Sequence, residues 1–179
     1  MTIQALATQG RDRISTGLAG IDTDKLKQLR SNQMKAVFGH FAEIPYRMQF
    51  VARIHGMAFV NDAASQSVNA TWYAMESSEK SLIWIANANT MPVDYSRLES
   101  IAARKVRKLI CVGDPNCQLV KAMTGIIPQI ESTWTLGQAA TRALYSGLEN
   151  VSVLYSPACE NGVPVEQLGA IFEREVNEL

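Results

Sequence analysis

The pattern of apolar and polar positions along the chain changes near residue 45. Before that point, Asp22-Thr23-Asp24 forms a good N-cap cluster, and Leu26, Leu29 and Val37 are spaced as the apolar stripe of a helix. Pro45 disfavours helix in the residue before it, so a connector is expected there. The pattern therefore predicts a helical extension with its connector over residues 1–45 and a second unit over residues 46–179.

The second unit begins with a strand pattern. Apolar residues alternate with other side chains from Met48 to Ile54, and His55-Gly56 then offers a tight reversal into the apolar run Met57–Val60. Two such runs joined by a short turn are typical of a β-hairpin. We therefore expect an antiparallel hairpin at one edge of a sheet.

Strand-like and helix-like segments alternate over the remainder of the chain. The apolar runs are short and nearly continuous, which is typical of strands that are buried on both faces. The alternation predicts an α/β fold: a Rossmann-like, mostly parallel sheet with helices on both faces. The predicted strands cover 82–86, 109–112, 127–130 and 151–155, and the predicted helices 68–75, 95–105, 116–123, 136–148 and 165–179.

Composition and charge restrict the classes of partner. The 179 residues are 47% hydrophobic and 19% charged, and 17 basic residues balance 17 acidic ones. A chain without net charge has no electrostatic footprint for nucleic acid, and the basic cluster 104–108 fits the end of a helix before a strand. No apolar run approaches the length of a membrane span, and no secretory leader is visible at Met1. Three cysteines without metal or redox spacing suggest reduced thiols in a cytoplasmic protein.

Most motifs for nucleotide or covalent chemistry are missing from the sequence. It contains no Gly-x-x-x-x-Gly-Lys-Ser/Thr phosphate loop, no Gly-x-Gly-x-x-Gly and no Gly-x-Ser-x-Gly. His40 and His55 are the only histidines, and both fall in predicted turns, so neither a metal site nor a catalytic triad is expected. The turn 112–116 either offers backbone N–H groups to an anion or simply joins a strand to a helix.

The stretch 60–71 is the most distinctive part of the chain. The run Met57–Val60 predicts a strand that carries Asn61 and Asp62 to its carboxyl end, and Ser67 can cap a helix that begins at Val68. Ligands of open α/β sheets bind at this edge.

This stretch resembles the start of the third domain of the Mur ligases, most closely that of the UDP-N-acetylmuramoylalanine–D-glutamate ligases, where the pattern is Asn-Asp-Ser-Lys-Ala-Thr-Asn. The segment 46–49 is similar to the family's His-Arg-Leu-Glu and keeps Arg47. The segments 155–159 and 169–172 resemble its Leu-Ser-Pro-Ala-Cys and its final Gly-x-x-Phe. The resemblance covers about residues 45–179 and implies a domain that binds D-glutamate and closes on ATP bound to a central domain.

The chain departs from the family where the resemblance implies the chemistry. Ala64 stands at a lysine position, Gln66 at a threonine position, and Met91 at the position of a second lysine. After Cys159, the residues 160–162 replace Ala-Ser-Phe, so a serine expected to hold the substrate carboxylate is lost. A dicarboxylate needs cations and donors to offset its desolvation, and this pattern removes them.

The resemblance and its departures predict a stand-alone domain without catalytic residues, metal or cofactor, acting as a binding or interaction module linked to peptidoglycan synthesis. One alternative is a protein that binds a small polar ligand in the crevice at the strand ends. Another is a ligase subunit that supplies its domain in trans. The expected partner is a Mur ligase, another cell-wall protein or a small polar ligand, and neither nucleic acid nor membrane. The predicted ligand-binding residues are Arg47, Asn61, Asp62, Gln66, Asn87, Asn89, Ser156 and Asn161.

Overall fold

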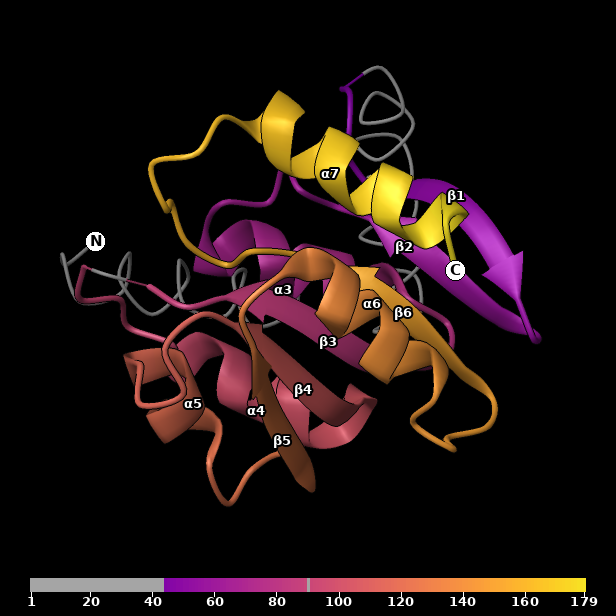
Figure 1. Ribbon diagram of the computed structural model, residues 1–179. Helices are drawn as coiled ribbons and strands as arrows, with labels where there is room; N and C mark the ends of the chain where they lie inside the picture. Colours follow the sequence, from indigo (N-terminus) through magenta and orange to yellow (C-terminus); the bar gives the residue numbers. More distant parts are fainter. Residues whose placement is uncertain (1–43, 90) are drawn as a thin grey trace, which may run out of the picture. The chain divides into compact units, whose positions relative to one another are not determined.

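A six-stranded sheet with the strand order β1-β2-β6-β3-β4-β5 forms the centre of the computed structural model, which describes residues 44–89 and 91–179 (Figure 1). The sheet confirms the predicted α/β class. The predicted helical extension falls almost entirely on residues 1–43, which lie outside the described residues. The strands are β1 (Gln49–Ile54), β2 (Met57–Asn61), β3 (Ser81–Asn87), β4 (Val106–Val112), β5 (Gln129–Thr133) and β6 (Val151–Tyr155).

The predicted edge hairpin is present. Strand β1 pairs with β2 in the antiparallel sense, and Ile54 lies opposite Met57 across the turn. His55 and Gly56 both have positive φ angles, of 48° and 83°, as a two-residue hairpin turn of the primed type requires. The remaining neighbours, β2 with β6, β6 with β3, β3 with β4 and β4 with β5, all run parallel.

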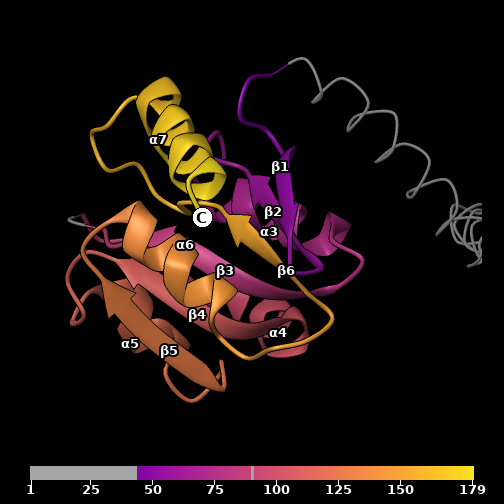
Figure 2. The ribbon, with the colours of Figure 1, turned by 45° about the vertical axis from the view of Figure 1, so that its right-hand side comes forward.

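Helices cover both faces of the sheet, as expected (Figure 2). The helices of the described residues are α3 (Val68–Ser77), α4 (Ser96–Lys105), α5 (Gln118–Met123), α6 (Leu136–Leu144) and α7 (Val165–Asn177). Trp84 on β3 is buried among residues of α3, α4 and α5, whereas Ile83 and Ile85 on the same strand pack in a second cluster with Phe172 of α7. Because alternate residues of a strand point to opposite faces, these two clusters are the two halves of the core.

Several predicted boundaries are wrong. Strand β4 begins at Val106 rather than 109, directly after the end of α4 at Lys105. Helix α5 begins at Gln118 rather than 116, because the Asp114 carboxylate accepts a hydrogen bond from the Asn116 amide and forms a local turn first. Helix α6 ends at Leu144, before the loop that contains Gly147 with a φ of 72°. Strand β5 covers Gln129–Thr133 rather than 127–130, because its register is set by pairing with Lys108–Val112 of β4.

The carboxyl ends of the parallel strands meet at one edge. Asn61 lies beside Tyr155, the Asp62 amide donates to the Tyr155 carbonyl, and the Ser156 amide donates to the Ile85 carbonyl. Asn61 and Ser156 therefore lie at the same edge of the sheet, as predicted. Within residues 44–89 and 91–179, no helix is both long and apolar enough to cross a bilayer.

Candidate functional site

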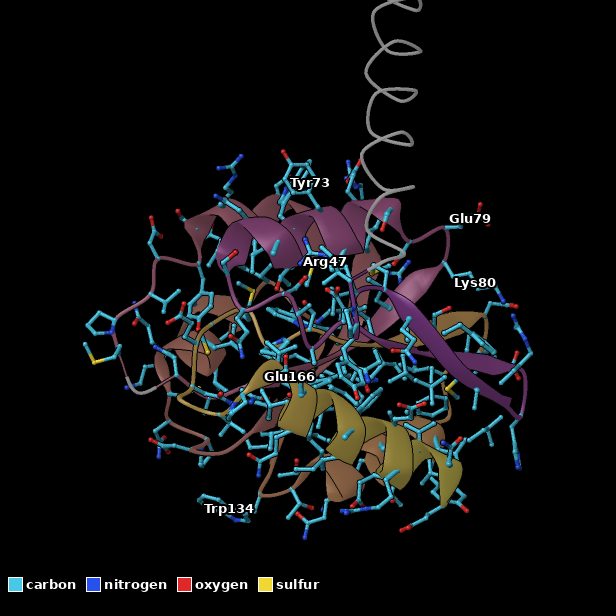
Figure 3. The ribbon with its side chains drawn as sticks, turned by 90° about the horizontal axis from the view of Figure 1, so that it is seen from above. Arg47, Tyr73, Glu79, Lys80, Trp134 and Glu166 are labelled. Carbon is cyan, nitrogen blue, oxygen red and sulfur yellow. The ribbon has the colours of Figure 1, made fainter. Side chains whose placement is uncertain are left out.

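Asp62 lies at the centre of this edge and is fully buried. Its Oδ1 accepts a hydrogen bond from the Met48 amide at 3.2 Å, and its Oδ2 accepts one from the Ser156 hydroxyl at 3.0 Å. The guanidinium Nε of Arg47 lies 3.9 Å from Oδ1. Arg47 lies between α3 and α7 in the view of Figure 3. Burial raises the pKa of Asp62 from 3.8 to about 6, and hydrogen bonds and the Arg47 charge only partly offset this effect.

A chain of hydroxyls extends from this carboxylate. The Ser156 hydroxyl lies 2.8 Å from the hydroxyl of Thr71, which donates to the carbonyl of Ser65 at 3.3 Å. When Asp62 is protonated, each group in this chain can donate once, from Asp62 to Ser156, from Ser156 to Thr71 and from Thr71 to the Ser65 carbonyl. When Asp62 is ionised, Ser156 must donate to Asp62 instead. The protonation state of Asp62 therefore decides whether the hydrogen bond between Asp62 and Ser156 is donated by Asp62 or by Ser156.

The backbone around Asp62 is strained. Tyr46, Met48 and Ala158 are not glycines, yet their φ angles of 58°, 47° and 63° lie in the left-handed region. Such residues cost about 1–3 kcal/mol each and persist only where the surrounding structure holds them. Backbone hydrogen bonds do so here, because the Ala64 amide donates to the Tyr46 carbonyl and the Ala158 amide to the Ser65 carbonyl. Three separate loops are thus tied together at the sheet edge.

Three predicted ligand-binding amides bond to the protein backbone. The Asn61 amide nitrogen donates to the Gly169 carbonyl of α7 at 2.9 Å, and its oxygen accepts from the Ala63 amide. Gln66 donates to the Val163 carbonyl, and the Asn161 oxygen accepts from the Val163 amide. These side chains position the loops of the edge.

Asn87 and Asn89, at the end of β3, bond to different parts of the protein. The Asn87 oxygen accepts a hydrogen bond from the Tyr155 hydroxyl at 3.3 Å. Asn89 instead donates to the Met91 carbonyl and to the Gln118 side chain of α5. The structure thus brings Arg47, Asp62 and Ser156 together, and it places Asn89 apart from them.

The lysine positions named by the resemblance carry no charge at this edge. Ala64 is half-buried, and its carbonyl accepts a hydrogen bond from Arg47 at 3.4 Å. The Met91 side chain is 71% exposed. No group of three or more His, Cys, Asp and Glu residues in the described part of the chain is arranged to hold a metal ion.

Sequence reasoning missed Thr71 as part of this network. The sequence did contain a signal for it. Thr71 lies four residues after the helix cap Ser67, which places it about one helical turn further along, and it is a polar residue on the buried face of α3. It also missed a cavity between α6 and α7, whose walls come from residues far apart in the sequence.

Curated relatives of this chain are UDP-N-acetylmuramoylalanine–D-glutamate ligases. That of Christiangramia forsetii is 28% identical over 89% of this chain, that of Porphyromonas gingivalis 29% over 89%, and that of Salinibacter ruber 27% over 97%. The chain spans only 36%, 35% and 38% of the lengths of these relatives. No protein-family model matches the chain.

Solved structures with a similar fold are also Mur ligases. The murein peptide ligase of Psychrobacter arcticus has a TM-score of 0.51 at 9% identity, and the UDP-N-acetylmuramate–alanine ligase of Thermotoga maritima has 0.50 at 8%. Each match covers 75% of this chain and 30% of the other. The predicted resemblance to a Mur ligase domain is confirmed by the sequence relatives, and the shared fold agrees with it.

Proposed function

We propose that this chain is a catalytically inactive relative of the Mur ligase C-terminal domain, acting in the cytoplasm as a binding or interaction module linked to peptidoglycan synthesis. One observation carries the proposal. At the sheet edge, the polar groups of Asn61, Asp62 and Ser156 bond to the protein itself, while the lysine positions hold Ala64 and Met91.

Charge supports this reading. Binding of a dicarboxylate needs cations and hydrogen-bond donors that replace its hydration. Arg47 faces the Asp62 carboxylate and the Ala64 carbonyl, and Glu160 adds an exposed anion after the Ser-Pro-Ala-Cys segment. Loss of one charged partner in a buried pair typically costs about 2–5 kcal/mol of binding. Two missing lysines would bring D-glutamate binding below a useful range.

The ligase assay tests the absence of activity. The purified chain is incubated with ATP, UDP-N-acetylmuramoyl-L-alanine and D-glutamate, and phosphate release is followed. We expect no release above the ATP-only control, while a full-length ligase relative under the same conditions is active. Release that depends on both substrates would overturn the proposal. Release only after mixing with a separate ATP-binding partner would instead support a ligase completed in trans.

A gain-of-function variant tests the physical reason. In the double variant Ala64→Lys/Met91→Lys, two cations return to the edge, and we expect D-glutamate to raise the thermal unfolding temperature, since a ligand that binds only the folded state stabilises it. The control Ala103→Lys/Tyr145→Lys adds the same charge at exposed positions of α4 and at the end of α6. A shift in both variants, or a shift in the unmodified chain, would contradict the argument.

A further inference from the structure

A cavity of about 520 Å³ lies between the start of α6 and helix α7, over the carboxyl ends of β3 and β4. Its volume falls within the usual range for small-molecule sites of about 300–1,000 Å³. The Asp62 network does not line it. The polar part of its wall comes from Asn87, Thr135, Arg174 and Glu175, and its apolar part from Val112, Leu136 and Leu168 with their neighbours.

Asn87 presents an unused donor to this cavity. The side chain is only 6% exposed, and its oxygen is occupied by the Tyr155 hydroxyl. Its amide nitrogen makes no hydrogen bond to another of the described residues. This nitrogen is not among the fully buried polar atoms without a partner, so it is open to the cavity and can donate to an acceptor there.

The start of α6 also lines the cavity. The Thr135 hydroxyl accepts a hydrogen bond from the Gln138 amide, which leaves the backbone N–H groups of Leu136 and Gly137 without an acceptor among the described residues. These N–H groups carry the partial positive charge of the helix dipole. The donors of Asn87 and of α6 therefore line one cavity.

The side-chain charges of the wall balance each other. Arg174 and Glu175 form an ion pair with a distance of 2.6 Å, and the Glu175 carboxylate lies so close to Gly137 that its Oε2 would clash with a Cβ there. Because the pair is neutral overall, the unpaired backbone N–H groups and the Asn87 amide leave the cavity with an excess of donors.

An exposed aromatic ring completes the wall. Trp134 directly precedes α6, lines the cavity and is 73% exposed, and Figure 3 shows it at the margin of the molecule. Large exposed aromatic rings beside an apolar wall offer a stacking surface to a planar ligand. Val112, Leu168 and Ile171 supply that wall.

We propose that the cavity between α6 and α7 binds a small molecule that combines one carboxylate with a planar, apolar body. The carboxylate accepts hydrogen bonds from the Asn87 side chain and the first N–H groups of α6, and the body lies against Trp134 and Leu168. The proposal does not depend on the missing ligase activity, because none of these residues belongs to the Asp62 network.

Solution NMR of the ¹⁵N-labelled full chain tests the proposal with three matched probes: 4-methylbenzoate, 4-methylbenzamide and 4-methylbenzylamine. We expect saturable shifts of the Gly137 amide, the Asn87 side-chain amide and the Trp134 indole N–H with the carboxylate. The benzamide should bind about 10-fold more weakly, and the amine more weakly still, because hydrogen bonds to a charged acceptor are the stronger ones. Equal binding of all three probes, or shifts around Ser65 and Asn161 instead, would overturn the proposal.

Two variants keep the test independent of folding. Asn87→Asp keeps the acceptor for Tyr155 but places an anion in the cavity, so 4-methylbenzoate binding should fall about 10-fold or more. Asn89→Asp is the matched control, with the same charge two residues away and outside the cavity wall. Trp134→Ala removes an exposed ring without loss of core packing and should weaken binding several-fold. Unchanged affinity in both Asn87→Asp and Trp134→Ala would refute the assignment.

Discussion

Replacement of Asp62 by asparagine removes the buried charge and keeps the shape of the side chain. An asparagine oxygen can still accept from the Met48 amide, and its nitrogen can donate to Ser156, which then donates to Thr71 and onward to the Ser65 carbonyl. The variant therefore reproduces the hydrogen bonds of protonated Asp62 at every pH. We expect Asp62→Asn to stabilise the protein at neutral pH.

The magnitude follows from the raised pKa. The folded protein holds the Asp62 proton up to about pH 6, whereas the unfolded chain releases it near 3.8. Between these values the folded state binds more protons, so the free energy of unfolding falls as the pH rises. A pKa difference of this size corresponds to about 3 kcal/mol in full, of which about 2 kcal/mol is lost between pH values of about 4 and about 7.5. The partial loss of the Arg47 contact reduces the gain of the variant.

Urea unfolding of the wild type and the variant at both pH values measures this difference. Asp62→Asn should gain about 2 kcal/mol relative to the wild type on going from about pH 4 to about pH 7.5. Asp94→Asn is the control, because Asp94 is exposed and its pKa is lowered by the hydrogen bond from the Ser96 amide, so its trend has the opposite sign. An Asp62→Asn variant that is destabilised more at the higher pH would show that the ionised form is the stable one and that the argument from burial is wrong.

Two further substitutions test the packing of this edge. Trp84→Phe removes the 2.8 Å hydrogen bond from the buried indole N–H to the Ser156 carbonyl. It should lower the free energy of unfolding by about 2–4 kcal/mol in urea titrations. The control Trp134→Phe on the surface should change it by less than about 0.5 kcal/mol. Gly113→Ala should cost about 2–3 kcal/mol in the same assay, because Gly113 has a φ of 125° and a Cβ there would lie 2.7 Å from the Cβ of Ala88. A stability loss for Gly113→Ala below about 0.5 kcal/mol would show that the Ala88 loop yields freely.

Periodicity identified the architecture because local pattern and tertiary burial agree there. The His55-Gly56 turn and the strand of Trp84 carry signals within a few residues. The position of β5 depends on its pairing with β4, and its predicted boundaries were wrong. The hydrophobic pattern of a sequence does not show such long-range contacts.

The candidate site was only partly accessible to sequence reasoning. That Asp62 and Ser156 lie at one edge could be predicted, since both follow strands of a mostly parallel sheet. Their hydrogen bond depends on β2 and β6 being neighbours, which the sequence pattern did not predict. That Asn61 and Gln66 bond to distant carbonyls depends on how α7 and the 160s loop return to the sheet, which no local spacing encodes. The unpaired amide of Asn87 depends on the orientation of one side chain and was equally invisible.

The strand order has a consequence for how the chain reaches its native state. Strand β6 is the last strand made, yet it lies between β2 and β3. Until Val151–Tyr155 is available, the hairpin β1–β2 and the three-stranded piece β3–β4–β5 have no shared strand, and the facing borders of β2 and β3 stay unpaired. Unpaired apolar borders are templates for pairing with other chains. A ribosome-bound or truncated chain that ends before residue 151 should therefore be prone to aggregate, and insertion of β6 is the long-range step expected to limit the folding rate.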